Sequence, residues 1–387
     1  MKFKKIDLPI NILLIIECCK EKPCSRKIEE YIENINNWDE FIFNAKCHGV
    51  LPIVYNSLKN VNSMEIPSSV LLKLRKIYFD IAKENILLTS ELINIVNLLD
   101  KHDIKYIAFK GPSLSHMAYG DITLRQYCDL DILIDIENLD SFSNLLIKNK
   151  YTTDENIIFL KNKFFISIAN DFSFFSKSNV HIELHWNLFR QVFHKESQKI
   201  DIWNNINKIK INKSMVNTIN NELLFVYLCI HGSKHLWERI EWLVDLNKLI
   251  MNNNLNWDII KLLSKKLNVD NMLNLGLLLV SELFFTKLPL DIEKRFKNKD
   301  LKLKRKILDL YKHSLFFKEG NINEILYKVL TISLLKNSNI DRIKYLISII
   351  FKPSQYDVYF LNLHNSFRFL YYFIRPYRFI HNKIFKK

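Results

Sequence analysis

The feature that most constrains this chain is a pair of aspartates, Asp129 and Asp131, inside the apolar run D-L-D-I-L-I. The apolar residues around the pair alternate over Leu130, Ile132 and Ile134, which is the period of a strand with one buried face. Residues two apart on a strand point to the same side, so the two carboxylates lie next to each other. Neighbouring carboxylates repel each other unless a cation lies between them. The pair therefore predicts a Mg²⁺ site that accepts phosphate oxygens, and the alternative is a solvated acidic strand end.

A turn upstream of the pair suits the same chemistry. The apolar residues 104–109 predict a buried strand, which Gly111, Pro112 and Ser113 bring to an end. Proline is favoured in the first turn of a helix, and glycine or serine near the cap leaves backbone N–H groups available. A helix N-terminus with Lys110 beside it attracts anions. The segment therefore predicts a phosphate site directly before the metal-binding pair.

A third acid lies in the segment N-V-H-I-E-L-H-W-N-L, in which apolar residues alternate with His181, Glu183 and His185. This pattern again predicts a strand with one polar face. Glu183 could complete a three-carboxylate site with Asp129 and Asp131. Two alternatives stay open: a surface pair of histidines, or a zinc site, for which no further ligand is evident.

Together these motifs resemble the polymerase-β-like nucleotidyltransferases, and within them a bacterial branch of largely uncharacterised members. The motifs are Lys110-Gly111, Tyr119-Gly120, Arg125, Asp129-Leu130-Asp131 and Glu183-Leu184-His185-Trp186. The resemblance also includes 45–58, 231–245 and parts of the C-terminal tail, so it extends over nearly the whole chain. The chain departs from the family pattern in its G-P-S turn, in the long spacing from Gly111 to Asp129, and in having Glu at the third acid.

The resemblance implies a Mg²⁺-dependent (or Mn²⁺-dependent) enzyme that transfers a nucleoside monophosphate from an NTP to an acceptor and releases pyrophosphate. It implies that three acids are both catalytic and metal-binding: Asp129, Asp131 and Glu183. It further implies that a second set binds the NTP: Lys110, Gly111, Ser113, Arg125 and Lys234. Glu183 would lie nearest the acceptor hydroxyl and help to deprotonate it.

The apolar pattern over 222–250 predicts one long helix. One of its faces carries polar residues spaced at helical intervals. These are His231, Lys234, His235 and Glu238. Lys234 could reach the β- or γ-phosphate of a nucleotide, and Asp245 could cap the helix or pair with Arg239 or a histidine. The alternative is a packed helix with a solvated polar face.

The expected fold class is α+β, with a small mixed-sheet catalytic core flanked by an N-terminal and a larger C-terminal helical region. The expected divisions are 1–95, 96–190 and 191–387. A helix is expected between Asn138 and Asn149, strands within 151–176, and a flexible join at 199–214. The small number of glycines and prolines, 6 and 8 in 387 residues, favours helices with short connections.

The net charge of +15 bears on the acceptor. Such a charge can attract nucleic acid, an anionic membrane or nucleotides. The chain is also rich in Lys, Asn and Ile, as expected from an AT-rich genome, so the charge can arise without a binding role. A small-molecule or modified-peptide acceptor is favoured; an RNA end such as that of tRNA is the alternative. A different hypothesis is a non-catalytic nucleotide- or RNA-binding protein of the same fold, against which the intact acids argue.

A cytoplasmic location is expected. The six cysteines are scattered without a C-x-x-C pair, which is typical of reduced thiols. No transmembrane segment is expected, because the longest apolar runs are too short to span a bilayer. The tail at 367–387 mixes basic and aromatic residues, which could rest on lipid headgroups or on RNA. The favoured interpretation is instead a terminal helix that packs its aromatic residues on the body.

Overall fold

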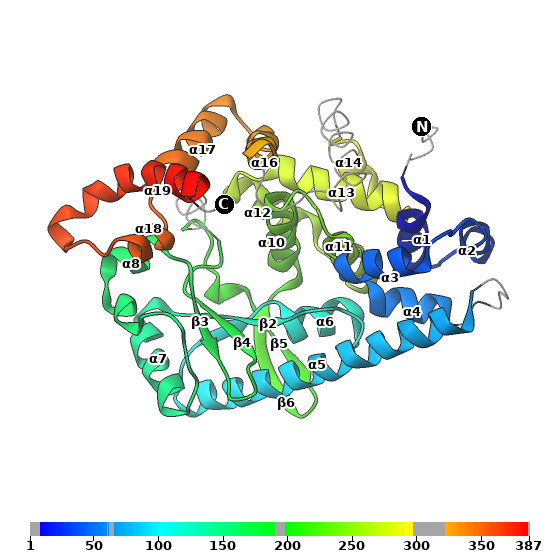
Figure 1. Cartoon of the computed structure of the whole chain (residues 1–387), viewed down its shortest axis with the longest axis horizontal. Helices are drawn as coiled ribbons and strands as arrows, with labels where there is room; N and C mark the ends of the chain where they lie inside the picture. Colours follow the sequence, from blue (N-terminus) through cyan, green and yellow to red (C-terminus); the bar gives the residue numbers. More distant parts are fainter. Residues whose placement is uncertain (1–7, 60, 62–65, 190–197, 297–321, 386–387) are drawn as a thin grey trace.

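The computed structural model describes the chain in five stretches. These are residues 8–59, residue 61, and residues 66–189, 198–296 and 322–385. Within them, helices pack around a small four-stranded sheet, and a separate two-stranded hairpin lies beside that sheet (Figure 1). The α+β class predicted from the sequence, a small mixed sheet with helical regions before and after it, is therefore confirmed.

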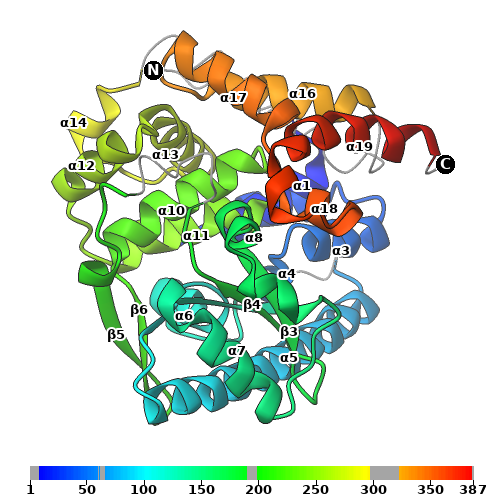
Figure 2. The same cartoon turned by 90° about the vertical axis from the view of Figure 1, so that its left-hand side faces the viewer.

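The N-terminal region is helical. Its helices are α1 (Ile10–Cys18), α2 (Ser25–Ile32), α3 (Trp38–Cys47), α4 (Leu51–Leu58) and α5 (Ser68–Lys101). The long α5 buries Leu88, Leu92 and Leu99 at helical spacing, so its second half packs on the sheet. Figure 2 shows α5 along the base of the molecule. The first expected division ends at residue 95, which lies inside this helix. The three-part division of the chain stays a prediction.

Four strands form the main sheet. In chain order they are β1 (Tyr106–Ala108), β2 (Asp129–Ile134), β3 (Asp171–Phe175) and β4 (His181–His185). Across the sheet the order is β1-β2-β4-β3, in which β2 and β4 are parallel and the outer pairs are antiparallel. The two strands that carry the predicted acids are therefore direct neighbours.

The two faces of this sheet differ, as the alternating pattern predicted. Leu130, Ile132 and Ile134 of β2 are buried with Ile182 and Leu184 of β4, in a core shared with α5. Burying each such side chain stabilises the fold by about 1.5–3 kcal/mol. The residues between them point to the other face, which therefore carries the acids and histidines.

The segment between β2 and β3 holds more helix than predicted. Helix α7 (Leu139–Lys148) confirms the helix expected there. The expectation of strands within 151–176 is confirmed for β3, and it is wrong for the residues before it, which form η2 (Ile157–Lys161) and α8 (Lys163–Ile168). The side chain of Asn162 accepts hydrogen bonds from the first backbone N–H groups of α8. This cap outweighs the strand propensity of the phenylalanines that follow it.

The segment expected to be a flexible join, 199–214, is largely ordered structure, so that expectation is wrong. Strands β5 (Ile206–Ile211) and β6 (Ser214–Ile219) pair in an antiparallel hairpin. Ile211 and Val216 are buried in the same core as the main sheet, and β6 packs beside β1. The alternating isoleucines in this Lys- and Asn-rich stretch are sufficient to give a strand one buried face.

The C-terminal region begins with a group of packed helices. They are α10 (Asn221–Lys234), α11 (Ile240–Asn252), α12 (Trp257–Leu267), α13 (Asp270–Phe284) and α14 (Leu290–Glu293). These helices share one hydrophobic core with α1–α4 and with α6 (Gly111–Tyr119). Helices that precede the sheet in the chain and helices that follow it therefore stabilise the same core, together with α6.

The single helix predicted over 222–250 is wrong, because it is broken between α10 and α11. Leu236 and Trp237 have φ of +53° and +56°, and the N–H of Trp237 donates to the carbonyl of Gly232 at 2.8 Å. The buried indole of Trp237 then lies against Gly232, where a Cβ would be only 2.4 Å from the ring. Glycine at this position makes room for the tryptophan, and the chain turns there.

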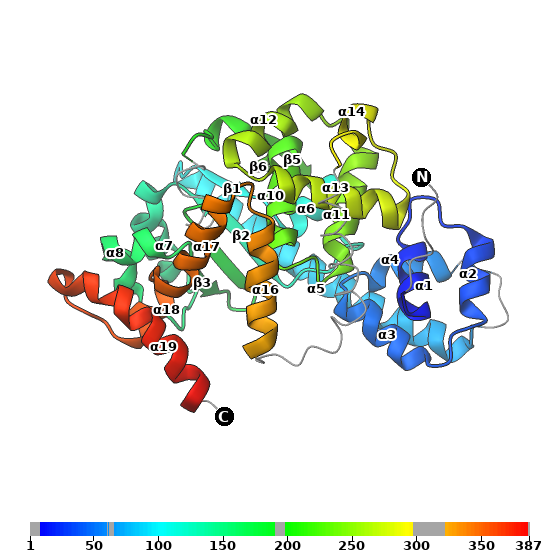
Figure 3. The same ribbon diagram turned by 90° about the horizontal axis from the view of Figure 1, so that it is seen from above.

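The last described residues form an outer layer of helices. They are α16 (Ile322–Leu334), α17 (Asn339–Phe351), α18 (Gln355–Phe360), η5 (Asn365–Leu370) and α19 (Tyr371–Phe385). From above, α18 and α19 lie at the opposite end of the molecule from α1–α4 (Figure 3).

The start of α19 departs from the expected packing of the tail. Tyr371 is buried, whereas Tyr372, Phe373 and Tyr377 are exposed, so the expectation that the tail packs its aromatic residues on the body is wrong for these three. Residues 386 and 387 of the predicted tail lie outside the described residues. None of the helices in the described stretches combines the length and apolar character needed to cross a membrane.

Candidate active site

The predicted acids lie on one face of the sheet, on two rungs that are separated by a single buried rung. In the parallel pair β2–β4, Asp129 is opposite His181 and Asp131 is opposite Glu183. These side chains alternate with the buried apolar ones and therefore share the polar face. The fold thus places Glu183 beside the aspartate pair, although the two strands are separated by about fifty residues of chain.

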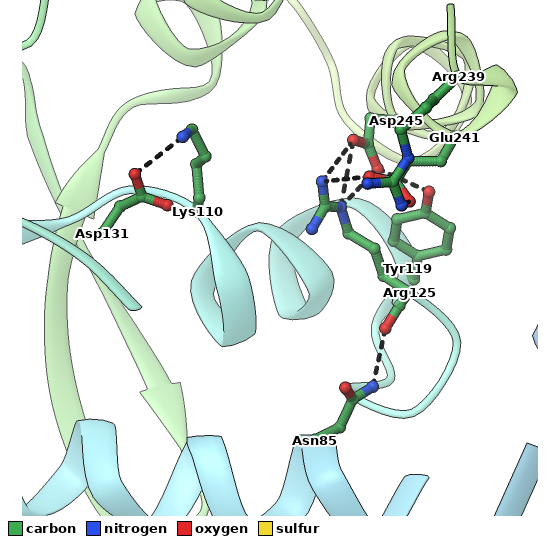
Figure 4. A network of polar contacts seen from close by, with 8 residues as sticks. All are labelled: Asn85, Lys110, Tyr119, Arg125, Asp131, Arg239, Glu241 and Asp245. Atoms are coloured by element: carbon green, nitrogen blue, oxygen red, sulfur yellow. Dashed lines mark hydrogen bonds and ion pairs between the residues drawn. The ribbon is translucent and has the colours of Figure 1, made fainter. Parts of the chain in front are cut away.

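The carboxylate of Asp131 is the centre of this cluster. Lys110 Nζ donates to Asp131 Oδ1 at 2.8 Å, as Figure 4 shows, and His185 Nε2 lies 3.0 Å from the same oxygen. His185 Nε2 is also 3.4 Å from Glu183 Oε2. The imidazole therefore connects the acid of β2 to the acid of β4. The side chain of Asp131 has no exposed surface, whereas that of Glu183 is 31% exposed.

The charges of this cluster shift one another's protonation. Burial opposes ionisation of Asp131, but Lys110 and His185 outweigh it and hold the pKa of Asp131 well below its usual value. Burial also opposes protonation of His185, yet its hydrogen bonds to Asp131 and Glu183 raise the pKa of His185 to about 9. Asp129 has no such partner, so burial and then the charge of Asp131 raise the pKa of Asp129. Added positive charge at this face would stabilise the ionised form of Asp129.

The donor set fits a divalent cation. Asp131 Oδ2 is buried and makes no hydrogen bond within the described residues, so one oxygen of an ionised carboxylate is left without a partner. Such an atom is costly unless a ligand satisfies it. Within the described residues, the ligand atoms of Asp131, Glu183 and His185 lie within 4.8 Å of one another, as do those of Asp129, His181 and Glu183. Carboxylate oxygens are the ligands that Mg²⁺ and Mn²⁺ prefer.

The predicted phosphate site is the N-terminus of α6. This helix starts at Gly111, whose φ of +52° is in the left-handed region and whose missing side chain lets the turn approach Asp129; a Cβ would be 3.1 Å from the Asp129 carbonyl oxygen. The helix N-terminus and Lys110 therefore adjoin the start of the metal strand. The Ser113 hydroxyl is fully buried without a hydrogen bond in the described residues, so it offers no exposed surface to a phosphate.

Two aromatic residues that the sequence did not single out border the site. Lys110 Nζ lies 5.7 Å from the ring centroid of Phe109 and 5.9 Å from that of Tyr227. Tyr227 is on α10 and stacks with His231, with centroids 6.0 Å apart. The one available signal was the spacing of Tyr227, His231 and Lys234, which places them on one helix face.

Lys234 ends α10, the helix that borders the site. Burial, and then the charges of Lys110, His235 and Lys234, lower the pKa of His231 well below its usual value. The charges of Lys234 and Lys110, which come from different elements, therefore both lower the pKa of His231. Whether Lys234 contacts a nucleotide stays a prediction.

Arg125 lies in a different cluster, at the other end of α6 (Figure 4). Its guanidinium is buried, with Nε 2.9 Å from Asp245 Oδ1 and Nη2 3.1 Å from Asp245 Oδ2 and 3.4 Å from Glu241 Oε1. Tyr119 also donates to Asp245, at 2.7 Å. The sequence suggested that Asp245 could pair with Arg239 or a histidine. In the structure Asp245 pairs with Arg125 instead. The guanidinium is engaged with protein acids, which leaves its predicted contact with the NTP without support in this geometry.

Comparison with known proteins identifies the family of the chain. A model of a family described as uncharacterised nucleotidyltransferases matches residues 34–285, which include all the predicted site residues. The chain belongs to this nucleotidyltransferase family. Comparison with curated proteins gives no match.

Among solved structures, the chain is similar to an antigenic nucleotidyltransferase-like protein from Paracoccidioides brasiliensis. The identity is 13% and the TM-score 0.36, over 53% of this chain and 94% of that chain. A likeness at this level carries no argument about the site, so the class of the protein, a nucleotidyltransferase, follows from the family match.

Proposed function

We propose that this protein transfers a nucleoside monophosphate from an NTP to an acceptor hydroxyl and releases pyrophosphate, with Mg²⁺ or Mn²⁺ as cofactor. The observation that carries the proposal is the arrangement of Asp129, Asp131 and Glu183 on alternate rungs, and therefore on one polar face, of the sheet. This face adjoins the N-terminus of α6 and Lys110, which together suit a triphosphate.

The proposed roles follow from the position of each acid. Asp129 and Asp131 would hold the cations, and Glu183 would hold the cation on the acceptor side. When bound, the cations neutralise phosphate charge and polarise the reacting oxygens. Glu183 is the most suitable of the three to take the acceptor proton, because its carboxylate is partly exposed and that of Asp131 is buried. The acceptor oxygen bonds to the α-phosphorus as the bond to the β-phosphate oxygen breaks.

Lys110 would bind phosphate by exchanging partners. It now neutralises Asp131 through a 2.8 Å ion pair, and Asp131 is the dominant influence that counteracts burial and keeps the pKa of Lys110 high. Once cations satisfy that carboxylate, the ammonium is free to pair with a phosphate oxygen. Its ring neighbours, Phe109 and Tyr227, would limit its movement to a short arc over the site.

The direct test is transfer of label from each α-³²P-NTP in the presence of Mg²⁺ or Mn²⁺. Candidate acceptors are peptides, sugars and small amines or alcohols, with tRNA as the alternative class. Labelled acceptor and free pyrophosphate in the wild type, and neither in Asp129→Asn, are the expected result. No transfer from any NTP to any acceptor class, with cations shown to bind, would count against an enzymatic function and favour a nucleotide-binding protein.

The scattered free cysteines support the expectation of a reducing, cytoplasmic compartment.

The salt dependence of binding distinguishes the two classes of acceptor. We favour a small molecule or modified peptide. An RNA acceptor would release counterions on binding, so its affinity would fall by about 0.7 log units per log unit of salt for each phosphate contacted. Submicromolar tRNA binding near physiological salt with a steep slope would reverse our preference.

A further inference from the structure

Of the two groups of metal-ligand side chains found in the described part of the chain, one is more accessible than the other. Asp129, His181 and Glu183 are all half-buried, and one ligand atom from each lies within 4.8 Å of the others. In the second group, Asp131 and His185 are buried and already joined by a 3.0 Å contact. A cation that arrives with its water shell can therefore enter the first group with less rearrangement.

We infer that this open group binds a divalent cation through the imidazole of His181 as well as through Asp129 and Glu183, and that the site therefore prefers Mn²⁺ to Mg²⁺. The inference rests on the proposed function for the location of the site, but it adds a ligand and a metal preference of its own. The ligand set is two carboxylates and one imidazole.

The preference follows from ligand chemistry. Mg²⁺ is a hard cation that binds oxygen and gives up its waters reluctantly. First-row transition cations gain more than Mg²⁺ from an imidazole nitrogen, and Mn²⁺ is the one that also suits carboxylates and phosphates. An imidazole among the ligands therefore favours Mn²⁺ and leaves the affinity for Mg²⁺ nearly unchanged.

The ring of His181 is held in place for this role. It stacks on Phe175 with centroids 5.1 Å apart and an interplanar angle of 21°, and its Nε2 lies 3.1 Å from Ser173 Oγ. Both partners come from β3, the strand next to β4. Neighbours of this kind fix the orientation of a ligating histidine. Two rungs along the same face, Asp131 Oδ2 is buried without a hydrogen bond in the described residues, and a cation nearby would satisfy it.

The test compares cation binding by chelator-stripped protein, without NTP or acceptor. Mn²⁺ affinity is measured from the EPR signal of the free ion, and Mg²⁺ affinity from its competition with Mn²⁺. The test variant is His181→Phe, which keeps a ring to stack on Phe175. The matched control is His102→Phe, at an exposed histidine that follows α5.

The wild type is expected to bind Mn²⁺ at least about tenfold more tightly than Mg²⁺. His181→Phe should lose about tenfold in Mn²⁺ affinity and less than about threefold in Mg²⁺ affinity, whereas the control keeps both. Echo-modulation EPR should show nitrogen coupled to Mn²⁺ in the wild type and in His185→Asn, and none in His181→Phe. If His181→Phe does not fold, His181→Asn replaces it.

Two results would overturn the inference: unchanged Mn²⁺ affinity in the His181 variant, or nitrogen coupling that disappears with His185 rather than with His181. The two proposals fail separately. A protein that binds Mn²⁺ through His181 and transfers no nucleotide contradicts only the proposed function. A protein that transfers nucleotide but binds Mn²⁺ equally well without His181 contradicts only this inference.

Discussion

Helix α6 has a buried charge cluster at each end, and the two clusters differ in what they leave unsatisfied. At its N-terminus, Lys110 and His185 share one oxygen of Asp131, and the other oxygen has no hydrogen bond in the described residues. At its C-terminus, Arg125 and its neighbours provide a donor for both oxygens of Asp245. The first cluster, called the unsaturated cluster below, retains an acid oxygen for a ligand. In the second, called the saturated cluster, the protein supplies a donor to each carboxylate oxygen of Asp245 and Glu241. Similar residue types are therefore proposed to serve chemistry at one end, and they join parts of the fold at the other.

The saturated cluster joins three parts of the fold. The side chain of Asn85 on α5 donates to the carbonyl of Arg125 at 2.7 Å, and Arg239 donates to Glu241 on α11 at 2.6 Å. Gly49, which follows α3 with φ of +71°, lies so close to Glu241 that a Cβ would be 1.6 Å from its carboxylate. The N-terminal helices, the loop before β2 and the C-terminal helices thus meet at one ion-pair network.

The largest effect is expected from Asp129→Asn in the unsaturated cluster. Transfer should fall at least about 10³-fold, because a ligand worth several kcal/mol at the transition state is lost. The melting temperature of the metal-free protein should stay the same or rise, because burial and Asp131 both raise the pKa of Asp129 and so disfavour its charge. Initial rates and a thermal melt test this. Wild-type turnover at saturating cation would remove Asp129 from the site.

Arg125→Met, in the saturated cluster, is expected to lower the stability of the fold and to leave the rate of transfer nearly unchanged. Asp245 loses its arginine inside the protein and Glu241 loses one of its two arginines, so the free energy of unfolding should fall by about 3–5 kcal/mol. The rate per folded molecule should change less than about threefold. Denaturant unfolding and active-site-normalised kinetics test this, with the exposed Arg75→Met as control and Asp245→Asn as a second variant. A raised KM for NTP in folded Arg125→Met would restore the predicted contact of Arg125 with the nucleotide.

Glu183→Gln distinguishes roles within the unsaturated cluster. The variant keeps size but removes the charge that would accept the acceptor proton, so the single-turnover rate should fall about 10²-fold or more. NTP–cation affinity should change less than about threefold, because Asp129 and Asp131 are expected to hold the triphosphate side. Rate and equilibrium binding are measured on one preparation. Lost binding with an unchanged rate would place Glu183 on the nucleotide side instead.

The smallest expected effect is a pH dependence of folding stability that arises at His48, next to the saturated cluster. Burial, and then the charge of Arg239, lower the pKa of His48 to about 4, and the neutral ring accepts a hydrogen bond from the Ile240 N–H. The unfolded chain therefore binds more protons than the folded protein between about pH 4 and 6.5. This contribution to stability is present above pH 6.5 and falls as the pH decreases, by about 1–2 kcal/mol between pH 7 and 5.

Unfolding free energies measured across that range for the wild type and His48→Gln test this expectation. The variant should show a flatter dependence on pH, and His102→Gln, at an exposed position, should not differ from the wild type. An equal slope in all three proteins would mean that His48 titrates normally in the folded state.

Much of the site could be predicted because strand alternation is a local property. The two-residue period of D-L-D and H-I-E-L-H was enough to predict two strands with polar faces, and glycine and proline marked the helix start that precedes both of them. The family resemblance supplied the expectation that these segments belong together. Three errors of secondary structure were at 151–176, 199–214 and 222–250, where a side-chain cap, a buried hairpin face and a tryptophan packed on a glycine determined the structure.

The sequence by itself determined which residues could carry the chemistry, because charge, side-chain length and strand period are written in the chain. Only the tertiary structure decided which of them share a site. It placed Glu183 beside Asp131 through the parallel pairing of β2 and β4, and it paired Arg125 with Asp245, a residue far along the chain. The physical reason is that a buried, positively charged side chain is stable only beside a negative charge that neutralises it. Which acid is within its reach depends on how the helices pack.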